Sequence, residues 1–190
     1  FTTDEQYSLD HPIGNIQPDL LMSVTPSFTY KGFTLSALFD MKFGGDVVSV
    51  SEAIATSHGI SKRTEQRGEL LLPGMNEDGT VNTQRIDAQL FYQAVGGRQQ
   101  AVAEEFVYNA SFIRLKEISF GYSFPSLLLR KTPVSSLRVS FVGRNLAYLM
   151  KHTHGTSPEG GYDTSMFSQA LDFSSLPYSR TFGFSINVGF

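Results

Sequence analysis

The sequence predicts an all-β fold: an antiparallel transmembrane β-barrel segment of about five strands, with long external loops. Three observations predict it. Apolar and polar residues alternate along about five stretches, and the apolar members carry no charge. Short and long links alternate between these stretches. Finally, the last residue, Phe190, is in register with the apolar residues of the final stretch.

The alternation is clearest at residues 33–43. Phe33, Phe39 and the other odd positions are apolar, whereas the even positions are polar apart from Leu38. Successive side chains of a strand point to opposite faces, so this stretch predicts a strand with one apolar and one polar face. Each strand is expected to approach the ~9–11 residues that cross a bilayer when tilted. The same pattern recurs at residues 22–30, 117–124, 137–142 and 181–190.

The links between the strands predict which end of the sheet faces which side. Lys31-Gly32 is expected to form a tight turn, and residues 125–135 form another short link. Residues 44–109 and 147–178 form long links. Consecutive antiparallel strands place successive links at opposite ends, as in outer-membrane barrels with short periplasmic turns and longer external loops. The final strand would then end on the periplasmic side.

These links give the expected organisation of the chain. Residues 1–20 are interpreted as the remainder of an external loop, and residues 21–190 as a barrel segment. The long segment 44–109 is too large for an idle connection. Two short helices are expected in it, at residues 47–56 and 83–95, the second because Ile86, Leu90 and Ala94 recur at helical spacing.

Composition excludes several classes of protein. The formal net charge of −3 gives no support for nucleic-acid binding, which favours a basic face. The absence of cysteine excludes disulfides, thiolate metal sites and thiol nucleophiles. No run approaches the ~18–20 apolar residues of a membrane-spanning helix. The start at Phe1, without an initiator Met, is interpreted as internal to a longer polypeptide.

A soluble β-sandwich is the main alternative fold, because its strands also alternate, with the apolar face inward. The charge-free, Phe-rich faces favour lipid contact, since Lys or Arg at mid-bilayer costs ~2–4 kcal/mol. Backbone groups in lipid must all be hydrogen-bonded, so the sheet has to close. Single-chain bacterial barrels start at about eight strands. We therefore expect residues outside this chain to complete the wall.

Specific residues carry a resemblance to a known family. The stretch YNASFIRLKEISFGY at residues 108–122 closely resembles the penultimate-region strand of SusC/RagA-type TonB-linked outer-membrane proteins of the Bacteroidetes. Phe124-Pro125 is similar to the turn that follows. Further similar stretches, in order along nearly the whole chain, are residues 18–19, 30–33, 72–74, 77–83, 136–139 and 143–146.

The resemblance implies the C-terminal part of a TonB-dependent transporter with a barrel of about twenty-two strands and an N-terminal plug. We expect neither the plug domain nor the TonB box within this chain. Such transporters import glycans or peptides with energy delivered through TonB, and they pair with a SusD-like surface lipoprotein. The implied partners are therefore the rest of the barrel and plug, the lipoprotein, TonB, lipid and cargo. No cofactor and no enzyme activity are expected. The alternative functions are a passive porin, a surface-binding barrel, or a soluble binding module.

Residues on the polar faces are the candidates for contact with cargo or plug. The alternative to cargo contact is that they only hydrate the wall or bond to the plug, and this alternative carries more weight. By parity they are Asp40, Lys42, Ser119, Arg138, Ser140, Arg144 and Asn187. A C-terminal assembly signal is expected at Ile186, Val188 and Phe190.

Other candidate sites are weaker. A metal site is conceivable at His152 and His154, which have the His-x-His spacing of some metal sites, with Glu159 and Asp163 nearby in the sequence. The glycine-rich surroundings favour an ordinary loop. Residues 76–79 lack the further oxygen ligands of a calcium loop. Adjacent Glu104 and Glu105 diverge on a strand, which argues against acid–base catalysis. Four loop aromatics offer stacking to sugars or a lid, although packing within the loops is the more common outcome: Phe91, Tyr92, Tyr162 and Phe167.

Overall fold

The computed structural model describes residues 12–190 apart from 77, 98–101, 164 and 166–167. This part of the chain forms two compact units, and each is described by itself. The sheet unit comprises residues 18–44, 110–152 and 177–190; the loop unit comprises residues 12–17, 45–109 and 153–176. Within the described residues, no helix has the length and apolar character needed to cross a membrane.

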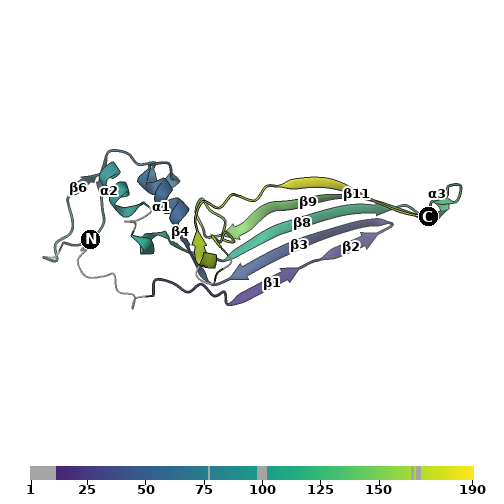
Figure 1. Ribbon diagram of the computed structural model, residues 1–190, viewed down its shortest axis with the longest axis horizontal. Helices are drawn as coiled ribbons and strands as arrows, with labels where there is room; N and C mark the ends of the chain where they lie inside the picture. The colour runs from purple at the N-terminus through teal and green to yellow at the C-terminus, as the bar shows by residue number, and fades with distance from the viewer. Residues whose placement is uncertain (1–11, 77, 98–101, 164, 166–167) are drawn as a thin grey trace. The chain divides into compact units, whose positions relative to one another are not determined.

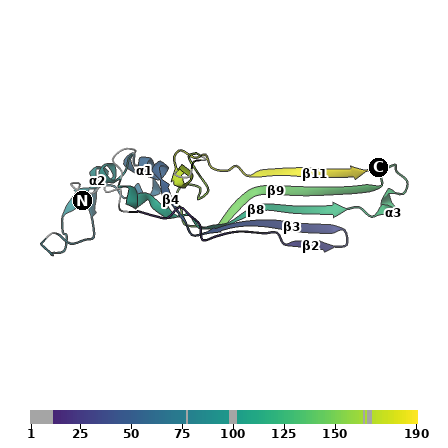
Figure 2. The same cartoon turned by 60° about the horizontal axis from the view of Figure 1, so that its bottom comes forward.

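The sheet unit is one antiparallel sheet (Figures 1 and 2). Two shorter strands, β1 (Leu20–Val24) and β2 (Ser27–Tyr30), pair with one side of β3. The long strands follow in the order β3 (Phe33–Phe43), β8 (Phe112–Ser123), β9 (Ser136–Lys151) and β11 (Thr181–Gly189), each antiparallel to the next.

The expected strand at residues 22–30 is divided by Pro26 into β1 and β2. Proline has no backbone N–H to donate to a neighbouring strand. Its carbonyl still accepts a hydrogen bond from the N–H of Ala37 at 3.1 Å. Both pieces therefore remain on the same side of β3.

The pairing register places most apolar residues of these strands on one face, which we call the apolar face. A bulge at Lys116 keeps the apolar residues of β8 on the same face as those of β3. Leu115 lies opposite Phe39 and Glu117 lies opposite Leu38, so Lys116 is an extra residue between them. None of the paired positions of this face carries a charge. From the short-turn end its rows across the sheet include Tyr30–Phe33–Tyr122–Val139–Ile186, Phe28–Leu35–Phe120–Phe141–Phe184 and Ala37–Ile118–Gly143–Phe182.

Rings dominate the apolar face. Phe33 stacks on Phe120 with centroids 5.7 Å apart, and Phe141 lies 5.4 Å from Phe184. Phe184 is 80% exposed and Phe28 is 68% exposed. Among the described residues of the sheet unit, no second sheet covers these rings. The arrangement therefore differs from a soluble β-sandwich, whose apolar faces pack on each other.

Both short links and the C-terminus lie at the same end of the sheet (Figure 2). The β2–β3 turn has positive φ at Lys31 (47°) and Gly32 (88°), as a two-residue hairpin turn of type I′ requires. The link from β8 to β9 contains the short helix α3 (Ser126–Leu129). All remaining links leave from the other end.

The loop expected to start at residue 147 begins later, so that boundary was wrong. Strand β9 continues to Lys151, because Ala147 pairs with Leu115 and Tyr148 with Arg114. Two register shifts in this pairing break the simple alternation. The period-two pattern therefore did not predict where β9 ends.

The loop unit contains short elements. Two small sheets form, one of β10 (Leu171–Asp172), β4 (Asp46–Ser49) and β7 (Val107–Asn109), and one of β5 (Glu69–Leu71) and β6 (Arg85–Asp87). The helices are α1 (Val50–Ser57), α2 (Ala88–Val95) and the 3-10 turns η1 (Lys62–Thr64), η2 (Ala103–Phe106) and η3 (Ser168–Ala170).

Both expected helices form, but each starts later than predicted. Val47 and Val48 pair with β7 instead, as β-branched residues favour strands. Ser49 then caps α1 and Asp87 caps α2 through their side-chain oxygens. The core between these helices consists of Ala53, Val95 and Phe106, with Phe91 and Tyr108 packed against it.

Candidate functional site

The polar face of the sheet unit contains all seven residues predicted to face the lumen. Arg114 pairs with Asp40, Ser119 with Ser36 and Val142, and Ser140 with Gly121, so these positions share one face. Strand β11 adds Asn187 opposite Arg138. The register thus brings the predicted set together, whereas their contacts with cargo or plug stay a prediction.

Two of these residues are held by neighbours in the wall. Arg144 donates through Nε to Glu117 Oε2 at 2.8 Å. Asp40 accepts from Lys116 Nζ at 2.9 Å and from Ser23 Oγ at 2.8 Å, and Arg114 lies 3.4 Å away. These charges already have partners, which supports a structural role for Asp40 and Arg144.

Arg114 itself is 5% exposed and lies between two rings. Its guanidinium carbon is 5.3 Å from the centroid of Tyr178 and 5.9 Å from that of Tyr148. Cation–π contacts of this kind stabilise a charge that has lost much of its water. Sequence parity missed Arg114, because the bulge at Lys116 reverses which residues of β8 face the polar side.

Arg138 lies beside a glycine. A side-chain carbon built on Gly121 would be 3.3 Å from Nε and 3.4 Å from Nη2 of Arg138. The bare glycine therefore leaves room for the guanidinium to rest against the sheet. This keeps Arg138 on the polar face, next to Ser140.

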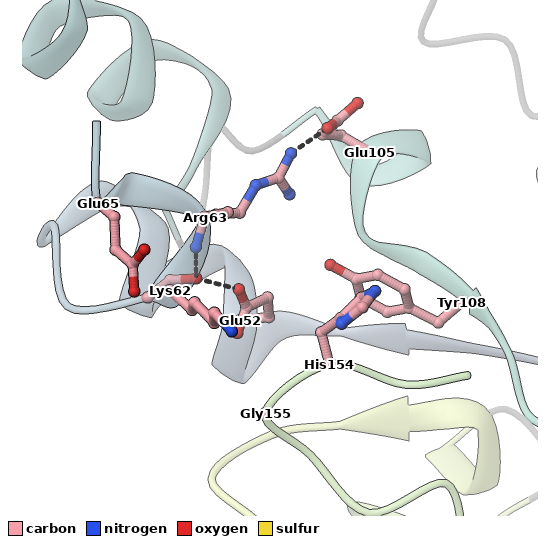
Figure 3. Close-up of a pocket in the computed structure, with 9 residues that line it drawn as sticks. Glu52, Lys62, Arg63, Glu65, Glu105, Tyr108, His154 and Gly155 are labelled. Carbon is pink, nitrogen blue, oxygen red and sulfur yellow. Dashed lines mark hydrogen bonds and ion pairs between the residues drawn. The ribbon is translucent and has the colours of Figure 1, made fainter. Parts of the chain in front are cut away.

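The loop unit contains a cavity of about 670 Å³ that is open to solvent (Figure 3). Four short segments build it: the first turn of α1, the turn η1, the segment from η2 to β7, and the turn at residues 154–155. Its lining residues are Glu52, Ser61, Lys62, Arg63, Glu65, Glu105, Tyr108, His154 and Gly155. We call it the Glu52 cavity.

Glu52 is the most buried acid of this lining, at 7% exposure. Its backbone N–H donates to Ser49 Oγ at 3.1 Å, which caps α1. Ser and Glu at this spacing form a capping box, in which the Glu side chain normally returns to the cap residue. Here the carboxylate instead accepts a hydrogen bond from Ser61 Oγ.

Tyr108 and His154 form one wall of the cavity (Figure 3). Their rings meet edge to face, with centroids 5.6 Å apart and planes at 77°. Burial raises the pKa of the Tyr108 phenol above its ordinary value, so the hydroxyl keeps its proton at neutral pH. His154 was predicted as a weak metal candidate, and the structure assigns it to this wall.

Arg63 and Glu105 pair at the edge of the cavity (Figure 3). The Arg63 guanidinium carbon also lies 5.1 Å from the ring centroid of Phe106, in the core of the unit. Glu105 and its neighbour Glu104 are exposed on η2, as predicted. Glu105 is thus engaged by Arg63.

A second cavity of about 570 Å³ lies between α1 and α2. His58, Arg67 and Asp87 contribute to its lining, and Arg67 donates to the carbonyl of Gly59 at 2.7 Å. Arg67 is thus engaged in a turn contact, and Asp87 caps α2. This cavity offers no buried acid comparable to Glu52.

The metal-like clusters do not assemble. Among the described residues, no three His, Asp or Glu side chains are grouped closely enough to hold a metal ion. Glu77 of the calcium-like turn lies outside the described residues. Asp78 accepts from the N–H of Thr80 at 2.9 Å and from its hydroxyl at 2.6 Å, and these bonds lower the pKa of the Asp78 carboxyl. The described residues Asn76 and Asp78 thus make turn hydrogen bonds with Thr80.

The loop aromatics mostly pack within the loop unit. Phe91 contacts the core, and the Tyr92 hydroxyl donates to the carbonyl of Arg63 at 2.9 Å. Tyr162 meets Phe173 edge to face at 5.5 Å. Phe167 lies outside the described residues. Packing inside the loops thus accounts for Phe91 and Tyr92. Tyr162 is 60% exposed, and its stacking on sugars or a lid stays a prediction.

Comparison with known sequences gives one informative relative. No protein-family model matches the chain. The chain is 28% identical over 183 residues to "TonB-dependent receptor P3" from Formosa agariphila, and the match covers 94% of this chain and 17% of the receptor. The chain therefore spans about a sixth of this relative's length.

Solved structures show the same fold. The chain is similar to the RagAB peptide importer in the "closed-closed" state, with a TM-score of 0.62 and 21% identity over 96% of this chain and 19% of that one. For the "open-open" state the TM-score is 0.61, with 20% identity over 92% of this chain and 17% of that one. These identities support the fold alone.

These comparisons confirm two predictions. The chain is similar, over nearly its whole length, to a TonB-dependent receptor. Its fold is that of an antiparallel segment of a TonB-dependent barrel. The relationship also supports a location in the outer membrane.

Proposed function

We propose that this chain forms the C-terminal part of the barrel wall, with two external loops, of a TonB-dependent importer in the outer membrane. It crosses the membrane with several strands and ends on the periplasmic side. The importer works with a SusD-like surface lipoprotein and carries glycans or peptides. Its polar face would line the lumen and meet cargo or the plug.

The observation that carries this proposal is the charge-free apolar face. Strand β3 has 11 residues, so ten steps of about 3.3 Å extend ~33 Å along the strand. A strand tilt of about 40° reduces this to ~25 Å along the membrane normal, which is the height of the apolar band of outer-membrane barrels. A surface of this size and composition matches the hydrocarbon layer.

The edges of the sheet support membership of a larger wall. Strand β11 pairs only with β9, and β1 and β2 pair only with β3, among the described residues. In lipid, the free backbone groups of such edges would each cost several kcal/mol. Further strands of the same transporter would satisfy them.

Uptake in the native bacterium tests the proposal. Cells lacking the gene should lose uptake of one labelled glycan or peptide, and cells lacking TonB should lose it equally. Purification of the complete protein in detergent should also recover a surface lipoprotein. Undiminished uptake without TonB would contradict energised import and favour a passive porin.

A further inference from the structure

We infer that the Glu52 cavity binds a primary ammonium group of the imported cargo. This rests on the proposed function, because it assigns a binding site to one external loop of the importer. The cavity volume of about 670 Å³ lies within the ~300–1,000 Å³ typical of small-ligand sites. It is large enough for a short peptide end or an amino sugar.

The buried carboxylate of Glu52 sets the chemistry. Glu52 is 7% exposed and lines the cavity, and one carboxylate oxygen accepts from Ser61. Within the described residues no Lys, Arg or His nitrogen lies within 4.0 Å of this carboxylate. A buried charge without a counter-charge is costly, so a ligand cation would be stabilised there.

The remaining oxygen of Glu52 lies against the backbone of Gly155. A side-chain carbon at Gly155 would be 2.9 Å from Glu52 Oε2, and Gly155 has a positive φ of 71°. Glycine adopts this conformation without strain and leaves the oxygen uncovered. Glycine at position 155 thus keeps the acid accessible from the cavity.

The surrounding charges favour a cation over an anion. The lining holds three carboxylates, Glu52, Glu65 and Glu105, against two permanent cations, Lys62 and Arg63. Because Arg63 is already bound by Glu105, it offers little to an anionic ligand. Sulfated or uronic glycans would meet an excess of negative charge here.

Tyr108 supplies the second recognition element. Its ring lines the cavity beside the acid and is held in place by His154 and the core. An aromatic ring next to a carboxylate suits an ammonium group, since the ring adds ~0.5–2 kcal/mol of cation–π attraction. Lys62, on the same lining, would donate hydrogen bonds to a carboxylate if the ligand is a zwitterion.

Binding assays on the complete transporter in detergent test the inference, with trialanine and glucosamine trimer as probes. At least one should bind, and its N-acetylated form should bind about tenfold more weakly or worse, because acetylation removes the charge. If trialanine binds, the source is a peptide end; if glucosamine trimer binds, it is an amino sugar. Equal binding of free and acetylated probes, or no binding of either, would overturn the inference.

Three variants connect the binding to this cavity. Glu52→Gln keeps the acceptor for Ser61 and removes the charge, so affinity should fall about tenfold. Glu104→Gln, on the exposed turn η2 and outside the lining, is the matched control and should bind as wild type. Gly155→Ala leaves Glu52 unchanged but places a methyl group against its Oε2 atom, so it should also lower the affinity. Unchanged affinity in Glu52→Gln and Gly155→Ala, with TonB-dependent uptake intact, would refute this site and leave the importer proposal standing.

Discussion

Replacing Ile118 with Arg should prevent assembly of the barrel, whereas the same replacement at the adjacent Ser119 should not. Ile118 lies in the middle of β8 on the apolar face, between Ala37 and Gly143. Ser119 lies on the polar face, between Ser36 and Val142. The two variants introduce the same charge one residue apart, on opposite faces.

The expected loss of folding free energy follows from the depth of the substituted residue in the membrane. An Arg on the lipid side costs ~2–4 kcal/mol at the midplane and about 0–1 kcal/mol near the interfaces. Tyr122 lies four residues from Ile118, or ~13 Å along the strand and about 10 Å along the membrane normal. Tyr122→Arg should therefore be nearly tolerated. At position 118 the cost corresponds to a roughly 30-fold to several-hundred-fold loss in the folding equilibrium.

The assay is heat modifiability of the complete protein in outer-membrane preparations, in which a folded barrel migrates differently before and after boiling. The folded fraction should fall for Ile118→Arg, stay high for Ser119→Arg, and be intermediate or high for Tyr122→Arg. Equal folded fractions for Ile118→Arg and Ser119→Arg would refute the assignment of the two faces.

Three further outcomes are expected. Deleting Phe190, which is 88% exposed at the end of the final strand, should lower the amount of heat-modifiable protein; a normal amount would argue against an assembly signal there. Phe106→Ala, at a side chain 1% exposed, should destabilise the loop unit by ~3–5 kcal/mol and speed its limited proteolysis, unlike Leu90→Ala at a position 68% exposed. Burial raises the pKa of Tyr108, so its neutral phenol stabilises the fold fully below the ordinary tyrosine pKa, and this stability is lost as pH rises through the raised pKa. The difference in phenolate absorbance between wild type and Tyr108→Phe should therefore appear above the ordinary tyrosine pKa. A difference that appears at or below that pKa would contradict the burial.

The strands of the sheet unit were predictable because a period of two directly reports which face a residue occupies. Each interruption of that period led to an error or an omission. Pro26 divides one predicted strand, the extra residue Lys116 moves Arg114 to the polar face, and the shifts opposite β8 hid the end of β9. A bulge changes the phase without any distinctive residue type, so alternation alone does not locate it.

The Glu52 cavity was not predictable in the same way. Its lining comes from segments around residues 52, 63, 105 and 154, which no motif connects. One local signal was present: Ser49 and Glu52 have the spacing of a capping box, which predicts the start of α1. The Glu52 side chain accepts a hydrogen bond from Ser61 and does not return to Ser49. This choice depends on tertiary packing, which the local sequence does not report.

The apolar face can be tested residue by residue. The chain contains no cysteine, so single cysteines can be placed along β8 of the complete protein and labelled with a fluorophore. Spin-labelled lipid should quench the probes at Ile118, Phe120 and Tyr122, and a water-soluble quencher should reach those at Glu117, Ser119 and Gly121. If all six positions respond alike, or if lipid reaches none of them, the rings do not face the membrane and the account is wrong.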